Sequence, residues 1–119
     1  MKKLFLLVSV LVLFVFSSYA GVVVNGVDIN KEDIRYCELL AHGKWLSTKV
    51  SIVVDYGQET KLFSKDQKIQ GSDGKTKKFH SVIDALNFMD KNGWEHVDSY
   101  FLTEGKSNVL HFLFKKKEN

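Results

Sequence analysis

One helical pattern stands alone in this chain, and it constrains the fold more than any other feature. Between Ser81 and Gly93 the apolar side chains recur at the spacing of one helix face, at Val82, Ala85, Leu86 and Met89. Ser81 is typical of a helix N-cap, with Asp84 as its capping partner, and Gly93 is typical of the residue that ends a helix. A helix this short is unstable alone in water, so the sequence predicts a sheet against which it packs.

The two segments after the helix predict part of that sheet. Residues 94–103 and 108–116 have strand patterns, and a turn centred on Gly105 and Lys106 pairs residues whose numbers sum to 211. In this register the face expected to meet the helix carries Val97, Phe101, Leu110, Phe112 and Phe114. The other face mixes aromatic, polar and apolar side chains, namely Trp94, His96, Asp98, Tyr100, Leu102, Val109, His111 and Leu113. On this face Tyr100 lies directly opposite His111.

Strand patterns also precede the helix. Residues 34–42 and 49–56 are read as strands. Either a short hairpin or an edge strand with a tight bend is predicted at Asn25-Gly26, and Ile69 is expected in a short edge strand. Residues 22–34 are expected to cover the second face of the sheet. The predicted fold class is therefore α+β, an antiparallel sheet of four to five strands with one helix packed on one face.

The first twenty residues have the pattern of a secretory signal peptide. Lys2 and Lys3 precede an apolar run, and Ser18 and Ala20 supply the small residues of a cleavage site. We therefore expect residues 1–20 to be removed by cleavage after Ala20, and residues 21–119 to form a single small domain. The expected location is the periplasm or the extracellular space, without membrane contact after cleavage. The alternative is an uncleaved anchor, because residues 4–24 carry no charge.

Charge and cysteine content narrow the classes of function. Removal of Lys2 and Lys3 leaves 15 basic and 14 acidic residues, a net charge of +1. A nearly neutral chain with mixed charges does not predict the positively charged surface that binds a polyanion, so no nucleic-acid partner is expected. The basic run at residues 115–117 is expected to be a solvated strand end. Cys37 is the only cysteine, which excludes an internal disulfide, and its apolar context favours a buried side chain over a reactive thiol or an intermolecular disulfide.

The sequence contains no motif for catalysis or metal binding. Its four histidines form no closely spaced pair, at His42, His80, His96 and His111. Neither a metal site nor a cofactor is therefore expected. The chain lacks a nucleophile elbow, a zinc-protease helix and a phosphate-binding glycine loop, so we expect no enzymatic activity. A carboxylate pair between Asp55 and Asp98 is the one catalytic arrangement that the strand assignments leave open.

The mixed face of the sheet is the candidate binding surface. Trp94, Tyr100 and His111 share this face. Trp45 is a further candidate because loop tryptophans anchor ligands and partners. The alternative for Trp45, which burial of tryptophan favours, is that it folds back over the sheet edge and closes the core. The leading hypothesis is an exported, non-enzymatic binding or protein-interaction module for an unknown protein or small ligand. The alternative is a structural homodimer that pairs through the same sheet face, and an uncharacterised enzyme ranks third.

The helix and the strand after it also carry a resemblance. The segments involved are Asp84-Ala85-Leu86-Asn87, Asn92-Gly93-Trp94-Glu95 and Phe112-Leu113-Phe114-Lys115-Lys116. They resemble a family of small exported bacterial domains of unknown function with a helix, Gly-Trp-Glu, strand signature. Together with the signal peptide, Val53-Val54-Asp55-Tyr56-Gly57-Gln58 is similar to a segment of small exported proteins of anaerobic gut bacteria. The resemblance implies a fold without an established activity.

Overall fold

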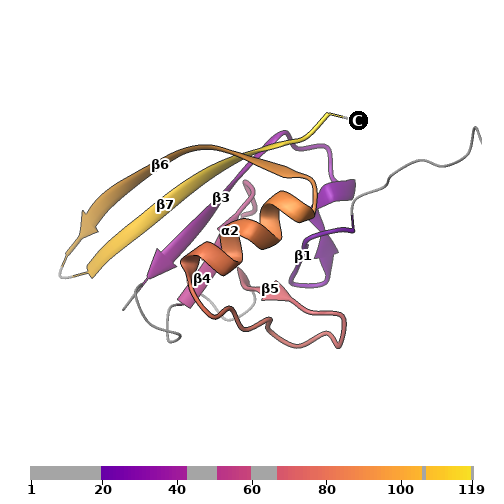
Figure 1. Cartoon of the computed structure of the whole chain (residues 1–119), viewed down its shortest axis with the longest axis horizontal. Coiled ribbons are helices and arrows are strands. Elements are labelled where there is room, and N and C mark those ends of the chain that lie inside the picture. Colours follow the sequence, from indigo (N-terminus) through magenta and orange to yellow (C-terminus); the bar gives the residue numbers. More distant parts are fainter. Residues whose placement is uncertain (1–19, 43–50, 60–66, 106, 119) are drawn as a thin grey trace, which may run out of the picture.

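The chain has an α+β fold built from two antiparallel sheets and a helix (Figure 1). The computed structural model describes residues 20–42, 51–59, 67–105 and 107–118. In these ranges a four-stranded sheet has the order β4-β3-β7-β6, and a three-stranded sheet has the order β2-β1-β5. The predicted fold class is confirmed. Residues 1–19 of the expected signal peptide and the candidate Trp45 lie outside the described residues.

The elements follow the predicted segments closely. Their bounds are β1 Val23–Val24, β2 Val27–Asp28, the 3-10 turn η1 Ile29–Lys31, β3 Tyr36–His42, β4 Ser51–Asp55, β5 Ile69–Gln70, α2 Val82–Lys91, β6 Trp94–Glu104 and β7 Ser107–Lys116. The Asn25-Gly26 hairpin is confirmed, since both residues have positive φ and Val24 pairs with Val27. The sequence did not indicate that this hairpin and β5 form a sheet of their own.

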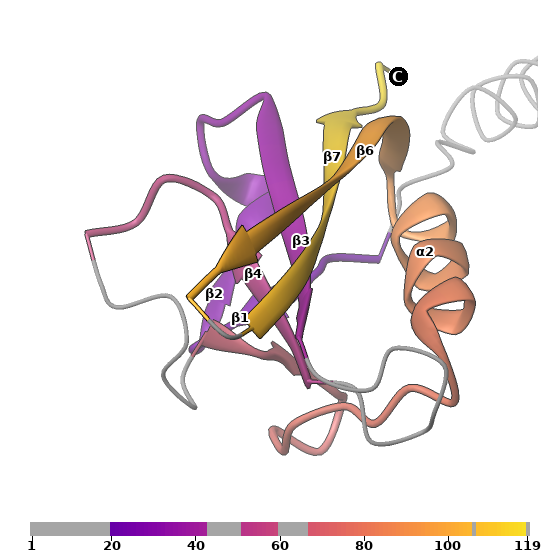
Figure 2. The same ribbon diagram turned by 90° about the vertical axis from the view of Figure 1, so that its left-hand side faces the viewer.

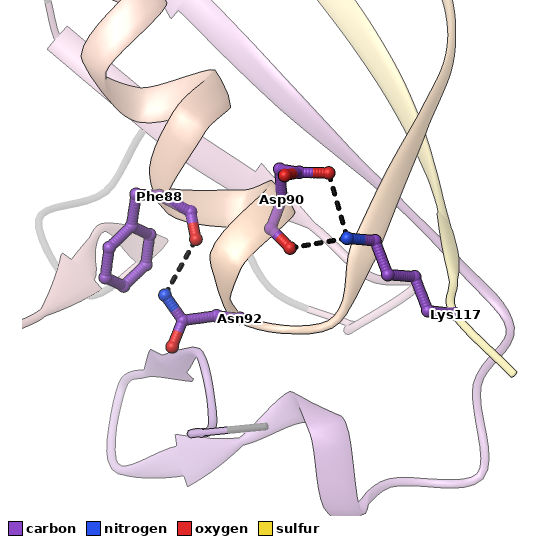
Figure 3. Close-up of polar contacts among 4 residues, drawn as sticks. All are labelled: Phe88, Asp90, Asn92 and Lys117. Atoms are coloured by element: carbon purple, nitrogen blue, oxygen red, sulfur yellow. Dashed lines mark hydrogen bonds and ion pairs between the residues drawn. The ribbon is translucent and has the colours of Figure 1, made fainter. Parts of the chain in front are cut away.

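Local hydrogen bonds fix both ends of α2. At the start, the Ser81 hydroxyl accepts from the Asp84 N–H at 3.2 Å, and the Asp84 carboxylate accepts from the His80 N–H at 2.9 Å. At the other end, the Asn92 side chain donates to the Phe88 carbonyl at 2.7 Å. Figure 3 shows this bond together with the contacts of Lys117.

Lys116 and Lys117, at the end of β7 and directly after it, form hydrogen bonds with other parts of the protein. The Lys117 ammonium donates to the Asp90 carbonyl at 2.7 Å and to the Asp90 carboxylate at 2.9 Å (Figure 3). Lys116 donates to the carbonyls of Asn30 and Glu32 and lies over the Trp94 ring. A cation near the C-terminal end of a helix is favourable because carbonyl groups converge there. The expectation of a merely solvated strand end is therefore wrong for Lys116 and Lys117.

The main core lies between the four-stranded sheet and α2, which covers one side of that sheet (Figure 2). Its buried side chains come from the sheet, the helix and the small N-terminal sheet, and they include Cys37, Leu39, Val54, Phe112, Phe114, Ala85, Met89, Val22, Val24 and Ile29. Residues 22–34 were expected to cover the opposite face. That expectation is wrong, because pairing of β1 with β5 and the burial of Val22, Val24 and Ile29 hold this segment in the helix-side core.

Asn30 joins the N-terminal segment to the helix end and to β6. Its side-chain oxygen accepts from the Val22 N–H at 3.0 Å and from the Trp94 indole N–H at 2.9 Å. Its side-chain amide donates to the Asn92 carbonyl at 2.7 Å. Trp94 is fully buried, so this bond satisfies a donor that would otherwise lie unpaired in the core.

A bulge in β6 divides the predicted register into two parts. From Asp98 to Glu104 the pairs with β7 sum to 211 as predicted, whereas His96 pairs with Phe114 and leaves Val97 as the extra residue. The one-residue shift places Trp94 and His96 on the helix side, where the His96 ring contacts the rings of Phe112 and Phe114. Their assignment to the second face is therefore wrong.

The helix also covers less of the hairpin than predicted. Val97 and Phe101 are each 51% exposed, although both were expected beneath the helix. A 10-residue helix is ~15 Å long, whereas an 11-residue strand spans ~37 Å. The far end of the β6–β7 hairpin, where Phe101 lies, thus extends past α2, whereas Val97 is exposed as the extra residue of the bulge.

The hydrogen bonds of the Asn30 side chain, here named the Asn30 hub, lead to a prediction about stability. Replacing Asn30 by Ala leaves the buried Trp94 indole N–H and the Val22 N–H without their acceptor, so we expect a loss of about 3 kcal/mol in the free energy of unfolding. Asn30→Asp keeps an acceptor for these two donors and should lose less. Asn87→Ala, on the exposed side of α2, is the control and should change stability by less than about 0.5 kcal/mol. Urea denaturation measures all three, and equal stability of Asn30→Ala and Asn87→Ala would contradict the role of the hub.

Candidate functional site

The candidate site lies on the face of the four-stranded sheet opposite α2, here named the distal face. Strand alternation fixes its membership, because Cys37, Leu39 and Ala41 of β3 point into the helix-side core. The registers then place two rows across the sheet on this face. One row is Asp55, Glu38, Leu113 and Asp98, and the next is Val53, Leu40, His111 and Tyr100.

Glu38 binds two aromatic side chains from other strands. The Tyr100 hydroxyl of β6 donates to Glu38 Oε1, and His111 Nδ1 of β7 lies 2.9 Å from the same oxygen. The Tyr100 and His111 rings are stacked, with centroids 4.7 Å apart and an angle of 11° between their planes. Three strands therefore contribute one hydrogen-bonded cluster, the Glu38 cluster, formed by Glu38, Tyr100 and His111.

The cluster fixes the proton positions on the His111 ring. An ionised carboxylate only accepts hydrogen bonds, so His111 Nδ1 carries the proton that it shares with Glu38. In the neutral ring Nε2 is then an acceptor. Nε2 is buried and has no hydrogen-bond partner among the residues that the structure describes, and the residue as a whole is only 6% exposed. The bond to Glu38 offsets part of the cost of burying this ring.

Negative charge surrounds Tyr100. Asp55 lies directly opposite Glu38, and Asp98 lies in the same row two strands further on. The pKa of Tyr100 is raised from 10.0 to about 12, mainly by the hydrogen bond to Glu38, with partial burial and the charges of Glu38, Asp55 and Asp98 as the smaller causes. Tyr100 is thus a neutral hydrogen-bond donor over the physiological pH range.

The structure brings together only part of the predicted site. Tyr100 and His111 are paired as predicted, whereas Trp94 is buried on the helix side of the sheet. Glu38 was missed at the sequence level. The sequence does show a carboxylate between apolar residues of a predicted strand, which is unusual. The residues near Glu38 did not indicate, however, that β3 would lie beside β7.

The structure excludes a catalytic pair between Asp55 and Asp98. Their strands, β4 and β6, are separated by β3 and β7 in the sheet order, which corresponds to ~14 Å. Cys37 is free and buried in β3, as predicted, and burial raises the pKa of its thiol, with the charges of Asp55 and Glu38 adding to the effect. A thiol in this state is a packing residue rather than a nucleophile.

Two further observations concern metals and membranes. In the described ranges 20–42, 51–59, 67–105 and 107–118, no group of three or more His, Cys, Asp or Glu residues is placed to hold a metal ion. No helix within this same part of the chain has the length and apolar character needed to cross a bilayer.

A hollow in the surface lies away from the Glu38 cluster. It has a volume of about 400 Å³ and is bounded by residues 32–35 and 115–118. Its lining mixes four basic with three acidic side chains, and two of the lysines already bind carbonyl groups of the protein. Because this lining mixes both signs of charge, it favours neither an anionic nor a cationic ligand. The Glu38 cluster is therefore the better candidate for a functional site.

Comparison with known proteins gives no family assignment. No protein-family model matches the chain, and neither a curated protein nor a solved structure matches it significantly. The resemblance to small exported bacterial domains therefore stays a prediction.

The Glu38 cluster predicts a titration behaviour. The folded protein favours neutral Tyr100, so the stability from this group is complete below pH 10 and is lost as the pH rises from 10 to about 12. Carbon-13 NMR of labelled tyrosine rings should show Tyr100 titrating near pH 12, and Glu38→Gln should move its pKa towards 10.0. Tyr100→Phe assigns the signal. An unchanged pKa in Glu38→Gln would show that Glu38 is not the cause.

Proposed function

We propose that the protein is an exported, non-enzymatic binding module that contacts a protein or small ligand through the distal face at Tyr100. The strongest support for this proposal is that Tyr100 is 41% exposed although its hydroxyl is bound to Glu38 and one face of its ring is stacked on His111. An aromatic side chain that is already ordered loses little conformational entropy when a partner covers it.

The surroundings of Tyr100 support the same function. Leu102, two residues further along the same face of β6, is 44% exposed. Tyrosine is enriched at the energetically important centres of protein interfaces, and an apolar neighbour such as Leu102 adds contact area that excludes water around such a centre.

The other candidate functions have less support. A general base must reach its substrate, but His111 Nδ1 is bound to Glu38 and Nε2 is buried. A homodimer that pairs two distal faces would bring Glu38, Asp55 and Asp98 of both copies together, which like-charge repulsion disfavours. A binding module is therefore the function that the geometry supports best.

Site-specific photocrosslinking tests the proposal. Benzoylphenylalanine at position 102 should form an adduct in the cells that express the protein, whereas the same group at Ile83 should not. Ile83 is the matched control because it is apolar, 63% exposed and located on α2. Adding Tyr100→Ser to the position-102 protein should reduce the adduct by roughly tenfold, as expected for loss of a central interface tyrosine. Equal adducts at positions 102 and 83, or none at 102, would contradict the proposal.

A further inference from the structure

Strand β6 is an exposed edge of the four-stranded sheet. It lies at the end of the order β4-β3-β7-β6, and no strand of the described residues pairs with its outer side. Figure 1 shows the β6–β7 hairpin reaching away from the small sheet, with β6 at its outer edge. A long edge strand presents unpaired backbone N–H and C=O groups, which are a template for another strand.

This edge is apolar and acidic rather than protected by basic residues. Residues 94–103 contain Glu95 and Asp98 but neither lysine nor arginine. Lysine is the residue that most often blocks an edge against pairing, and proline is also absent. Phe101 and Leu102 are both about half exposed. Edge protection is thus limited to the bulge at Val97, which leaves residues 98–104 as a regular segment.

The charge on the distal face identifies the complementary partner. Glu38 and Asp55 lie directly opposite each other on neighbouring strands, an arrangement that destabilises an isolated sheet. Asp98 continues the same row at the exposed edge, next to the half-exposed ring of Tyr100. A cation placed over this row would relieve the repulsion, and the face of a tyrosine ring also attracts cations.

From these features we infer that the partner is an extended peptide segment rich in lysine or arginine, which pairs with residues 98–104 of β6 as an additional strand and sets its basic side chains over Asp98 and Tyr100. This inference rests on the proposed function, because it names the partner of the same face. Backbone pairing supplies affinity in this mode of recognition, and the alternate side chains supply specificity. The raised pKa of Tyr100 supports it, since part of that shift comes from the three carboxylates.

A second copy of the chain is the less favourable occupant. Antiparallel pairing of two β6 strands about a two-fold axis would bring the same acidic strand to both sides of the new contact. A basic strand instead meets opposite charge at Asp98, which lies on the edge strand itself.

Fluorescence anisotropy with synthetic peptides tests the inference. The probe is a labelled peptide of alternating threonine and lysine, and the control is the same peptide with glutamate in place of lysine. At low salt the lysine peptide should bind at least roughly tenfold more tightly than the glutamate peptide, and the difference should shrink at high salt. Methylating alternate backbone nitrogens of the lysine peptide keeps its charge but removes donors for strand pairing, and should weaken binding by roughly tenfold.

Protein variants locate the binding surface. Asp98→Lys should weaken binding of the lysine peptide by roughly tenfold. Asp33→Lys makes the same charge change at an exposed loop position outside the four-stranded sheet, and should leave binding nearly unchanged. Circular dichroism checks that both variants are folded.

Each outcome bears on a separate claim. Equal binding of the lysine and glutamate peptides would overturn the cationic partner, and equal binding of the methylated peptide would overturn the strand pairing. Equal effects of Asp98→Lys and Asp33→Lys would overturn the location. If these tests fail while the adduct at position 102 is still observed, the partner class is wrong but the proposed binding face stands. Loss of that adduct as well would remove the proposed function.

Discussion

A single carboxylate, Glu38, organises the face of the sheet that α2 does not cover. It lies on β3, yet it accepts hydrogen bonds from side chains of β7 and β6, so it connects three of the four strands of the main sheet. Its position follows from the opposite face, because burial of Cys37 and Leu39 in the core leaves Glu38 only the distal side. The core thereby determines where the polar cluster forms.

The same interaction explains how Tyr100 can be exposed and still ordered. An isolated tyrosine on a sheet edge would sample several rotamers, but here the hydroxyl is bound to Glu38 and one ring face is stacked on His111. His111 in turn is oriented by its Nδ1 contact with Glu38. The protein therefore maintains an aromatic contact surface within a row of negative charge, and both properties depend on one side chain.

The bulge in β6 separates the start of the strand, which is buried in the fold, from its far end, which is exposed to solvent. Before the bulge, Trp94 is buried and bound to Asn30, which fixes the start of β6 against the helix end and the N-terminal segment. After the bulge, the strand passes beyond the short helix, and its apolar side chains face solvent. The fully buried Trp94 thus lies at one end of β6, and the candidate interaction surface lies towards the other.

These features also show what the sequence could and could not predict. The helix, its cap at Ser81, the Asn25-Gly26 bend and the pairing of Tyr100 with His111 depend on local patterns, and all were predicted. The bulge has no sequence signal of its own, and its single extra residue moved Trp94 and His96 to the other face. Glu38 entered the site only because β3 lies beside β7, a contact between residues more than seventy positions apart. Long-range strand order of this kind is not encoded in a local pattern.

The central claim is that Glu38 holds Tyr100 in place on the distal face, and NMR relaxation of labelled tyrosine rings measures this directly. In the unmodified protein the Tyr100 ring should be as rigid as the backbone of β6, and in Glu38→Ala it should reorient freely on the nanosecond timescale while the fold is retained. A Tyr100 ring that is equally mobile in both proteins would contradict the account.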